Sequence, residues 1–192
     1  MGRNRKYDRD EVLDTAMRLF WQRGYQATSI AEISQTTGLN TASMYKEFGD
    51  KDGLFEGALR HYRGHVLAPR FEILIDQPNL RGVEAFLNSV ADGAAKAEYR
   101  GCLMMNHLAQ KHAISADAAD MIDEVCAAIE GLLEAALSNA QSAGDLPPEK
   151  DPADLASYVM CCVHGFVLYG RHQDKKHCIP SIYETVLHAL RA

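Results

Sequence analysis

The sequence predicts an all-α protein of about nine helices, with an N-terminal three-helix domain followed by a helical C-terminal domain. Apolar residues recur with helical spacing along almost the whole chain, for example from Val12 to Phe20. No convincing run alternates between apolar and polar residues within hairpin turns, which argues against a sheet. Hydrophobic residues make up 47% of the 192 residues and charged residues 24%, which excludes a disordered chain.

Local start and stop signals predict the helices of the N-terminal domain. A residue that can cap a helix precedes each apolar stretch, and a glycine follows it. The expected start and end residues are Asp8 and Gly24 for the first helix, and Ser29 and Gly38 for the second; Asn40 should cap a third short helix at residues 41–47, which the break at Phe48-Gly49-Asp50 follows. A longer helix is expected from Lys51, and Pro69 should interrupt or end it because proline lacks the N–H that a helix interior needs.

The remainder of the chain predicts further helices, separated by loops with proline, glycine and charged residues. These helices are expected at about 80–97, 101–112, 116–142, 150–171 and 179–190. We expect the domain boundary to fall within the long helix after Lys51, which gives one domain at residues 1–55 and a second at residues 56–192.

Charge is unevenly divided along the chain. The formal net charge is -6, which argues against a protein that coats nucleic acid without specificity. Residues 1–63, however, carry a balance of +1, and residues 64–192 a balance of -7. Three cations lie in the segment from Gly2 to Lys6. A slightly basic front and an acidic back are compatible with one local nucleic-acid surface.

The five cysteines are scattered and form no CxxC pair, so the simplest interpretation is free thiols in a reducing cytoplasm. The N-terminus is polar and predicts no signal peptide, and no apolar run approaches the roughly 20 residues that span a bilayer. Cys161, Cys162 and His164 raise the question of metal, but only Cys161 and His164 share a helix face. Core packing is favoured there, and no metal or cofactor is predicted.

Two short helices joined by a glycine-containing turn at residues 29–48 indicate a helix-turn-helix, whose second helix enters the major groove of DNA. The small hydroxyl or methyl groups of Thr41, Ala42 and Ser43 suit contacts with base edges. Tyr45 and Lys46 can reach phosphates, and Lys51 adds charge at the next helix start. The basic tail with Arg3, Arg5 and Lys6 is expected along the minor groove. The alternative is a plain three-helix bundle whose polar residues are only solvated.

The stretch from Phe20 to Phe55 resembles the N-terminal domain of TetR-family transcriptional regulators. The matching pieces are Arg23-Gly24-Tyr25, Ala27-Thr28-Ser29-Ile30, Ile33-Ser34, Gly38-Leu39, Ser43-Met44-Tyr45, Phe48 and Lys51. The resemblance implies a homodimeric repressor that reads a palindromic operator in double-stranded DNA and releases it when an effector binds the C-terminal domain.

By matched position, the resemblance implies that Ser29 and Lys51 hold phosphates and that Tyr45 contacts the DNA backbone. Thr41, Ala42, Ser43 and Lys46 would face the bases, and Asn40, at the start of their helix, is a further candidate DNA-binding residue. Family members often carry a basic residue where this chain has Ala31. Base reading from the first helix of the motif is therefore not expected.

The segment from Arg100 to Asn106 resembles the "GC" stretch of one subgroup of the family, in which some members sense electrophiles, oxidants or metal stress. A thiol in the first turn of a helix, beside Arg100, should be more acidic and nucleophilic, which makes Cys102 a candidate sensor. The alternative is a small buried residue that packs the helix start.

The apolar helices between residues 80 and 142 suggest an effector cavity, although plain core packing explains the same pattern. Candidate lining residues are Phe86, Val90, Cys102, Met104, His107, Met121, Val125 and Phe166. The helices at 150–171 and 179–190 are apolar on more than one face, so they need a second partner. In the family, such helices pair across the dimer.

Two other functions compete with a DNA-binding repressor switched by a small molecule or an electrophile. One is a helical enzyme or stress-response binding protein that uses Cys102 and histidines, although no nucleophile and base stand at a suggestive spacing. The other is a structural helical dimer that does not bind DNA. Salt-sensitive, sequence-specific DNA binding separates these alternatives from the repressor.

Overall fold

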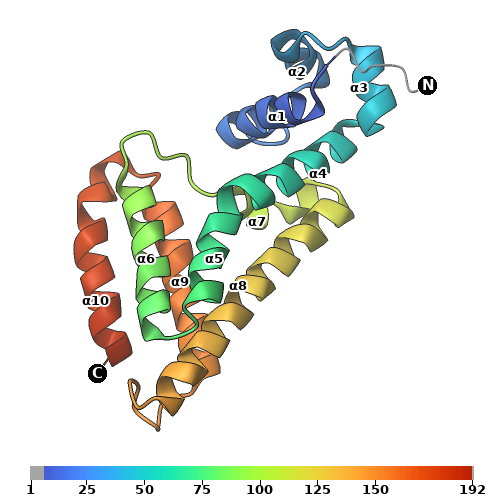
Figure 1. Cartoon of the computed structure of the whole chain (residues 1–192). Helices are drawn as coiled ribbons and strands as arrows, with labels where there is room; N and C mark the ends of the chain where they lie inside the picture. The colour runs from blue at the N-terminus through green and yellow to red at the C-terminus, as the bar shows by residue number, and fades with distance from the viewer. Residues whose placement is uncertain (1–6, 192) are drawn as a thin grey trace. The chain divides into compact units, whose positions relative to one another are not determined.

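The computed structural model describes residues 7–191, and the secondary structure within that range is helical (Figure 1). The first five helices are α1 (Arg9–Arg23), α2 (Ile30–Thr37), α3 (Thr41–Phe48), α4 (Lys51–Tyr62) and α5 (Ala68–Asp76). The next are α6 (Leu80–Ala95), α7 (Leu103–Leu108), α8 (Ala116–Ser142), α9 (Pro152–Tyr169) and α10 (Ile179–Arg191). A π-helical turn, η1 (Arg63–Leu67), and two 3-10 helices, η2 (Lys111–Ala113) and η3 (Gln173–Cys178), lie between them. The all-α prediction is confirmed.

The predicted helix starts are formed by side-chain caps. The Asp8 carboxylate accepts a hydrogen bond from the Asp10 N–H at 2.8 Å, and Ser29 Oγ accepts one from the Glu32 N–H at 3.1 Å. Asn40 Oδ1 accepts from the Ser43 N–H at 2.9 Å. Each cap satisfies an N–H group that has no partner inside its helix, which fixes where the helix begins.

The long helix after Lys51 differs from the expectation at its middle. The interruption is the π-helical turn η1, which lies before Pro69, and the chain then continues as α5. Pro69 stands in the first turn of α5, where an N–H group has no helical partner to lose. The proline therefore helps to start a helix. The helix expected at 101–112 is also shorter, with α7 followed by η2.

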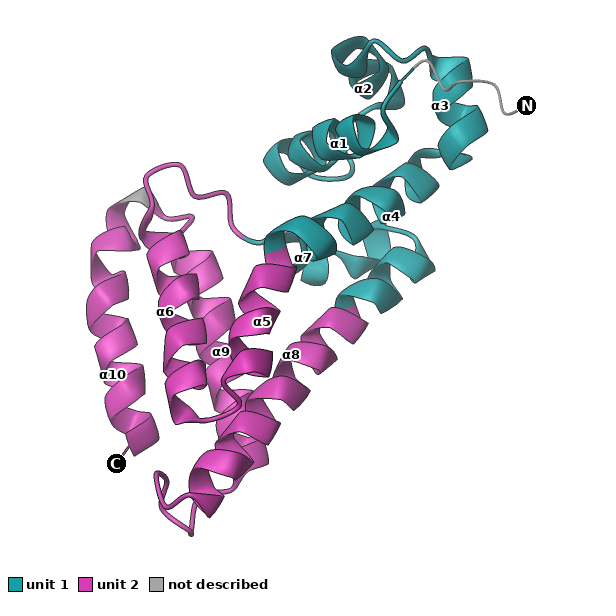
Figure 2. Cartoon of the chain, viewed as in Figure 1, with its two compact units in different colours: residues 1–66, 102–122 teal, residues 67–101, 123–192 magenta. Residues whose placement is uncertain are grey.

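Two compact units divide the chain (Figure 2). The first contains Met1–Val66 and Cys102–Ile122, and the second contains Leu67–Gly101 and Asp123–Ala192. In the first unit α4 packs against α1, and the rings of Phe20 and Phe55 meet edge to face at 5.0 Å. In the second unit α6 packs against α5, α9 and α10, with Phe86 and Phe166 buried.

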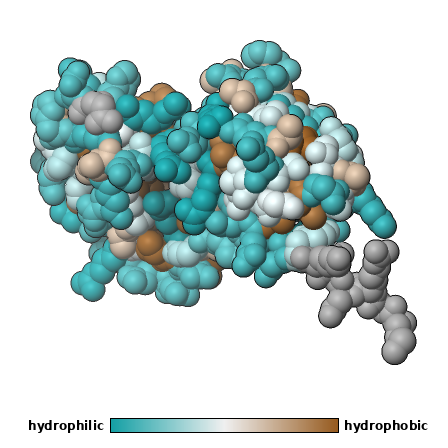
Figure 3. All heavy atoms as spheres, turned by 90° about the horizontal axis from the view of Figure 1, so that it is seen from above, coloured by the Kyte–Doolittle hydropathy of each residue, from teal (hydrophilic) through white to brown (hydrophobic). Residues whose placement is uncertain are grey.

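Polar side chains dominate the face in Figure 3, where apolar residues are interspersed among hydrophilic ones. Among the described residues, no helix has both the length and the apolar character that crossing a membrane requires.

Candidate nucleic-acid interface

The α2–α3 pair forms the predicted helix-turn-helix within the first unit. Gly38 adopts a left-handed conformation, with φ 70° and ψ 0°, at the end of α2. Residues without a Cβ reach this conformation at low cost, so the chain can turn within a few residues into α3. Ile33 and Met44 are buried on the inner faces of the two helices and anchor α3 against the core.

The outer face of α3 exposes four of the predicted DNA-binding residues, namely Thr41, Ala42, Tyr45 and Lys46. Residues three and four apart share one helix face, so these side chains form one surface. Half of the Tyr45 surface is exposed, so its ring is accessible to a binding partner. Ser43 is half-buried beside them.

The start of α1 holds α3 from the side. Tyr7 Oη donates a hydrogen bond to Glu47 Oε2 at 2.7 Å, and Arg9 Nε donates to Glu47 Oε1 at 3.1 Å. The Arg9 guanidinium also lies 5.5 Å from the centre of the Phe48 ring. No sequence pattern signals these contacts, since the two hydrogen bonds join residues 40 and 38 positions apart. The basic tail with Arg3, Arg5 and Lys6 lies outside the described residues.

Lys51, the first residue of α4, has its ammonium group held by two contacts with the turn that follows α1. Its Nζ is 4.3 Å from the centre of the Tyr25 ring and 3.4 Å from the carbonyl oxygen of Gln26. Burial lowers the pKa of Lys51. An ammonium group that has already lost part of its hydration and is held in place loses less on binding a phosphate. Ser29 is exposed, and its hydroxyl hydrogen remains able to donate because its oxygen accepts the cap bond.

Tyr25 and His107 extend this cluster into the core. Tyr25 Oη donates to Asp52, and the Tyr25 backbone N–H donates to His107 Nε2 at 3.1 Å. His107 is 3% exposed, and its ring lies 5.0 Å from that of Phe55. The sequence predicts His107 only as a lining residue of an effector cavity, and it assigns Tyr25 no contact with Lys51. The contact of Tyr25 with Lys51, and that of His107 with the Tyr25 backbone, are visible only in the structure.

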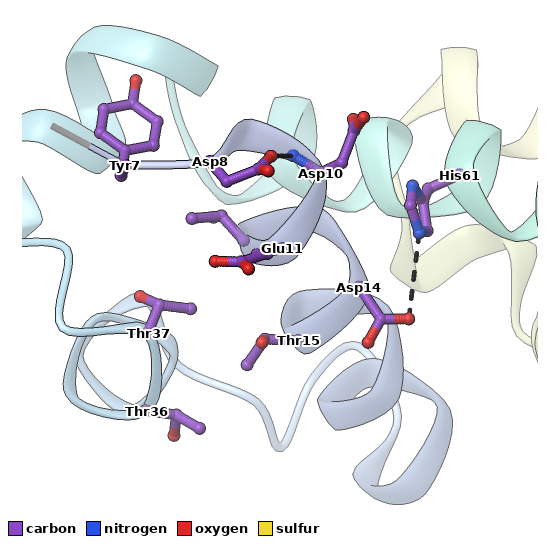
Figure 4. A pocket seen from close by; sticks show the side chains of 10 residues that line it. Tyr7, Asp8, Asp10, Glu11, Asp14, Thr15, Thr36, Thr37 and His61 are labelled. Carbon is purple, nitrogen blue, oxygen red and sulfur yellow. Dashed lines mark hydrogen bonds and ion pairs between the residues drawn. The ribbon is translucent and has the colours of Figure 1, made fainter. Parts of the chain in front are cut away.

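The first unit also contains a cleft lined by acidic residues. A cleft of about 720 Å³ lies among α1, the end of α2 and His61 of α4 (Figure 4). Four carboxylates line it, from Asp8, Asp10, Glu11 and Asp14, with His61 Nε2 3.9 Å from Asp14. A surface rich in carboxylates disfavours phosphates, so this cleft is not a candidate for DNA contact.

No three His, Cys, Asp or Glu side chains converge as metal ligands in the part of the chain that the structure describes. Within residues 160–180, Cys161 is exposed, while Cys162 and Cys178 are half-buried.

The candidate effector residues are all buried and belong to both units. Cys102, Met104, His107 and Met121 lie in the first unit, and Phe86, Val90, Val125 and Phe166 lie in the second. Cys102 is 9% exposed and stands at the N-cap of α7, where its side chain makes no capping hydrogen bond.

Comparison with protein families accounts for both parts of the chain. Residues 12–58 match the bacterial regulatory proteins of the tetR family, and residues 80–185 match a tetracyclin repressor-like C-terminal domain. The chain belongs to the TetR family. The helix-turn-helix prediction is thereby confirmed, and this TetR-family chain is a DNA-binding regulator rather than an enzyme.

Individual relatives agree with this TetR assignment. The chain is 32% identical over 189 residues to the HTH-type transcriptional repressor ComR of Escherichia coli K12, covering 97% of this chain and 90% of ComR. A cysteine mutant of the TetR-family regulator CifR, complexed with 26-base-pair operator DNA, superposes with a TM-score of 0.81 at 27% identity, covering 97% of this chain and 99% of CifR. A TetR-family regulator from Agrobacterium tumefaciens shares the fold, with a TM-score of 0.83 at 23% identity over 95% of this chain and 97% of that one.

Proposed function

We propose that this protein is a cytoplasmic repressor that binds a palindromic operator as a homodimer and leaves it when a small molecule or an electrophile binds. The observation that carries the proposal is the exposed face of α3, held by the buried Met44 and flanked by the half-buried cation of Lys51. The ComR relative is a repressor, and the CifR neighbour is bound to operator DNA, which supports the same activity here. Residues 1–55 then bind DNA, and residues 56–192 bind the effector and dimerise.

In this proposal each exposed residue has a defined partner on the DNA. Thr41, Ala42, Ser43 and Lys46 face base edges in the major groove, because they start the helix that enters it. Tyr45 contacts the DNA backbone, and Ser29 and Lys51 hold phosphates at two helix starts. Asn40 supports them by capping α3.

Dimerisation is supported by the outward face of α9. Three large side chains are exposed there, with Tyr158 38%, Leu168 59% and Tyr169 42% accessible. Large apolar groups left in water on one helix are typical of a surface that another chain covers. We infer that α9 and α10 pair with the same helices of a second copy.

The part of the proposal that concerns the effector rests on the segment around Cys102. If this segment senses the effector, the chain is a member of the "GC" subgroup. An electrophile that alkylates this thiol, or a small molecule that binds beside it, releases DNA by favouring a state whose two α3 helices no longer match successive major grooves, about 34 Å apart. Burial of Cys102 equally supports a packing role.

The decisive experiment measures binding to DNA flanking the chain's own gene, over a range of salt concentrations. Wild-type protein should bind with a salt-dependent affinity, and Lys51→Ala should reduce the slope by about one because it removes one cation from a phosphate. Arg60→Ala, on the same helix and paired with Glu56, is the charge-matched control and should leave the slope unchanged. An unchanged slope for Lys51→Ala contradicts the phosphate assignment. Adding electrophiles, oxidants or metals to the same assay tests release.

A further inference from the structure

His107 is held as a neutral imidazole of one tautomer. Its Nε2 lies 3.1 Å from the backbone nitrogen of Tyr25, and its Nδ1 lies 2.8 Å from the carbonyl oxygen of Leu103. A backbone N–H always donates, so Nε2 must accept and carries no proton. A carbonyl always accepts, so Nδ1 carries the proton. Both ring nitrogens of this buried group are therefore satisfied in one arrangement only.

Tyr25 transmits this constraint to the DNA-binding surface. Its backbone is held by His107, its ring lies 5.0 Å from the Phe55 ring, and its hydroxyl donates to Asp52. The same ring forms the platform for the Lys51 ammonium, whose Nζ is 4.3 Å from the ring centre. Each contact lies inside the first compact unit.

We propose that His107 is a positioning residue for operator binding, which fixes Tyr25 and through it the cation of Lys51. The inference rests on the proposed function in one respect, that Lys51 meets a DNA phosphate. His107 lies five residues after Cys102, on the helix that Cys102 begins, so a ligand or adduct that displaces the start of α7 also withdraws the acceptor from Tyr25. The bond thus joins the candidate effector segment to the DNA contact within a single unit.

The same geometry makes the link sensitive to acid. If Nε2 of His107 were protonated, it would become a donor opposite the Tyr25 N–H, which is also a donor. The hydrogen bond between Tyr25 and His107 would then break. Burial lowers the pKa of His107, and the bond to the Leu103 carbonyl acts the other way, so this occurs below the ordinary histidine range. On α1 and α4, four charged groups have partners other than His107: Arg23 pairs with Glu32, Asp52 with Tyr25, Glu56 with Ser115, and Lys51 with the Tyr25 ring.

Two variants separate positioning from simple packing. His107→Leu removes both bonds and keeps an apolar side chain, and His107→Gln offers an amide oxygen as acceptor and an N–H as donor but cannot titrate. His112→Gln, at an exposed histidine of η2, is the matched control. All three are made in the whole 192-residue chain.

The first measurement is affinity for the DNA that wild-type protein binds near its own gene, from pH 7.5 down to about 4.5, a range that extends well below the ordinary histidine pKa because burial lowers the pKa of His107. His107→Leu should bind about tenfold more weakly, as expected when one buried hydrogen bond is removed. His107→Gln should bind like wild type at neutral pH and, unlike wild type and His112→Gln, should not weaken on acidification. Equal binding by His107→Leu and wild type overturns the inference, as does equal weakness of the Leu and Gln variants.

The second measurement needs no DNA. The Tyr25 ring should shift the Lys51 side-chain proton resonances upfield, and His107→Leu should remove that shift while His107→Gln keeps it. If the Leu variant does not fold, titration of wild type answers the same question, because the Lys51 signal should move together with the His107 ring signals. A Lys51 signal that ignores His107 overturns the inference. If wild type binds no DNA but the Lys51 shift depends on His107, the proposed function fails and the positioning link stands.

Discussion

The outer face of α3 and the start of α7 carry the two sets of candidate functional residues, and they differ in burial. Thr41, Ala42 and Lys46 are exposed on α3, whereas Met104 and His107 on α7 are almost completely buried. An exposed polar or aromatic residue on a fixed helix contributes little to the core, so a functional reason for it is easier to defend. A buried apolar residue is already explained by packing, and the same pattern fits a cavity lining.

The largest effect is expected when the buried side chain that holds the exposed face of α3 in place is removed. Met44→Ala empties a core position that is 1% exposed and should lower the free energy of unfolding by about 2–5 kcal/mol. Chemical denaturation measures this decrease, and DNA binding should fall with it because α3 is no longer held. An unchanged midpoint would mean that α3 does not depend on this anchor.

Tyr45→Ala tests the exposed face itself and should have a smaller effect, confined to binding. Affinity for the operator should fall about tenfold, as expected when one interaction with the DNA backbone is removed, while stability stays within about 0.5 kcal/mol of wild type. Anisotropy titrations and denaturation curves on the same preparations separate the two quantities. Normal operator binding by Tyr45→Ala would show that another surface of the unit meets DNA.

The same contrast explains which features can be predicted from the sequence. The caps at Asp8, Ser29 and Asn40 are predictable and are formed, because a cap depends on residues only two or three positions apart. The π-helical turn is not predictable in this way, since an extra residue in a helix leaves no fixed local pattern. The Tyr25–His107 bond also escapes prediction, because it joins a backbone group to a side chain 82 positions away.

Acid should destabilise the folded chain through His107, with a moderate effect. Its pKa is lowered by burial in the folded state, so the unfolded chain binds the proton first as the pH falls. The unfolding free energy should therefore decrease below about pH 6.5, by at most about 1.4 kcal/mol per pH unit for this one proton. Denaturation curves of His107→Gln should show a shallower pH dependence than wild type. The exposed His112→Gln serves as control, and a matching slope for both variants would assign the acid sensitivity elsewhere.

The smallest expected effect is a difference in labelling rate between two thiols, which tests whether the start of α7 is buried in solution. In the monomer, where the α9 face that carries Cys161 is uncovered, a disulfide reagent should label the exposed Cys161 within the folded protein and reach Cys102, which is 9% exposed, only when α7 opens locally. Mass spectrometry of peptides from a labelling time course gives both labelling rates.

If Cys102 is labelled more slowly than Cys161, and the Cys102→Ser variant still releases DNA on addition of an electrophile, Cys102 packs the helix start. Another residue then binds the effector. If Cys102 labels as fast as Cys161 although it is buried, its reactivity must exceed that of an ordinary thiol. A Cys102→Ser variant that no longer releases DNA would then identify the buried segment, rather than the exposed one, as the effector site.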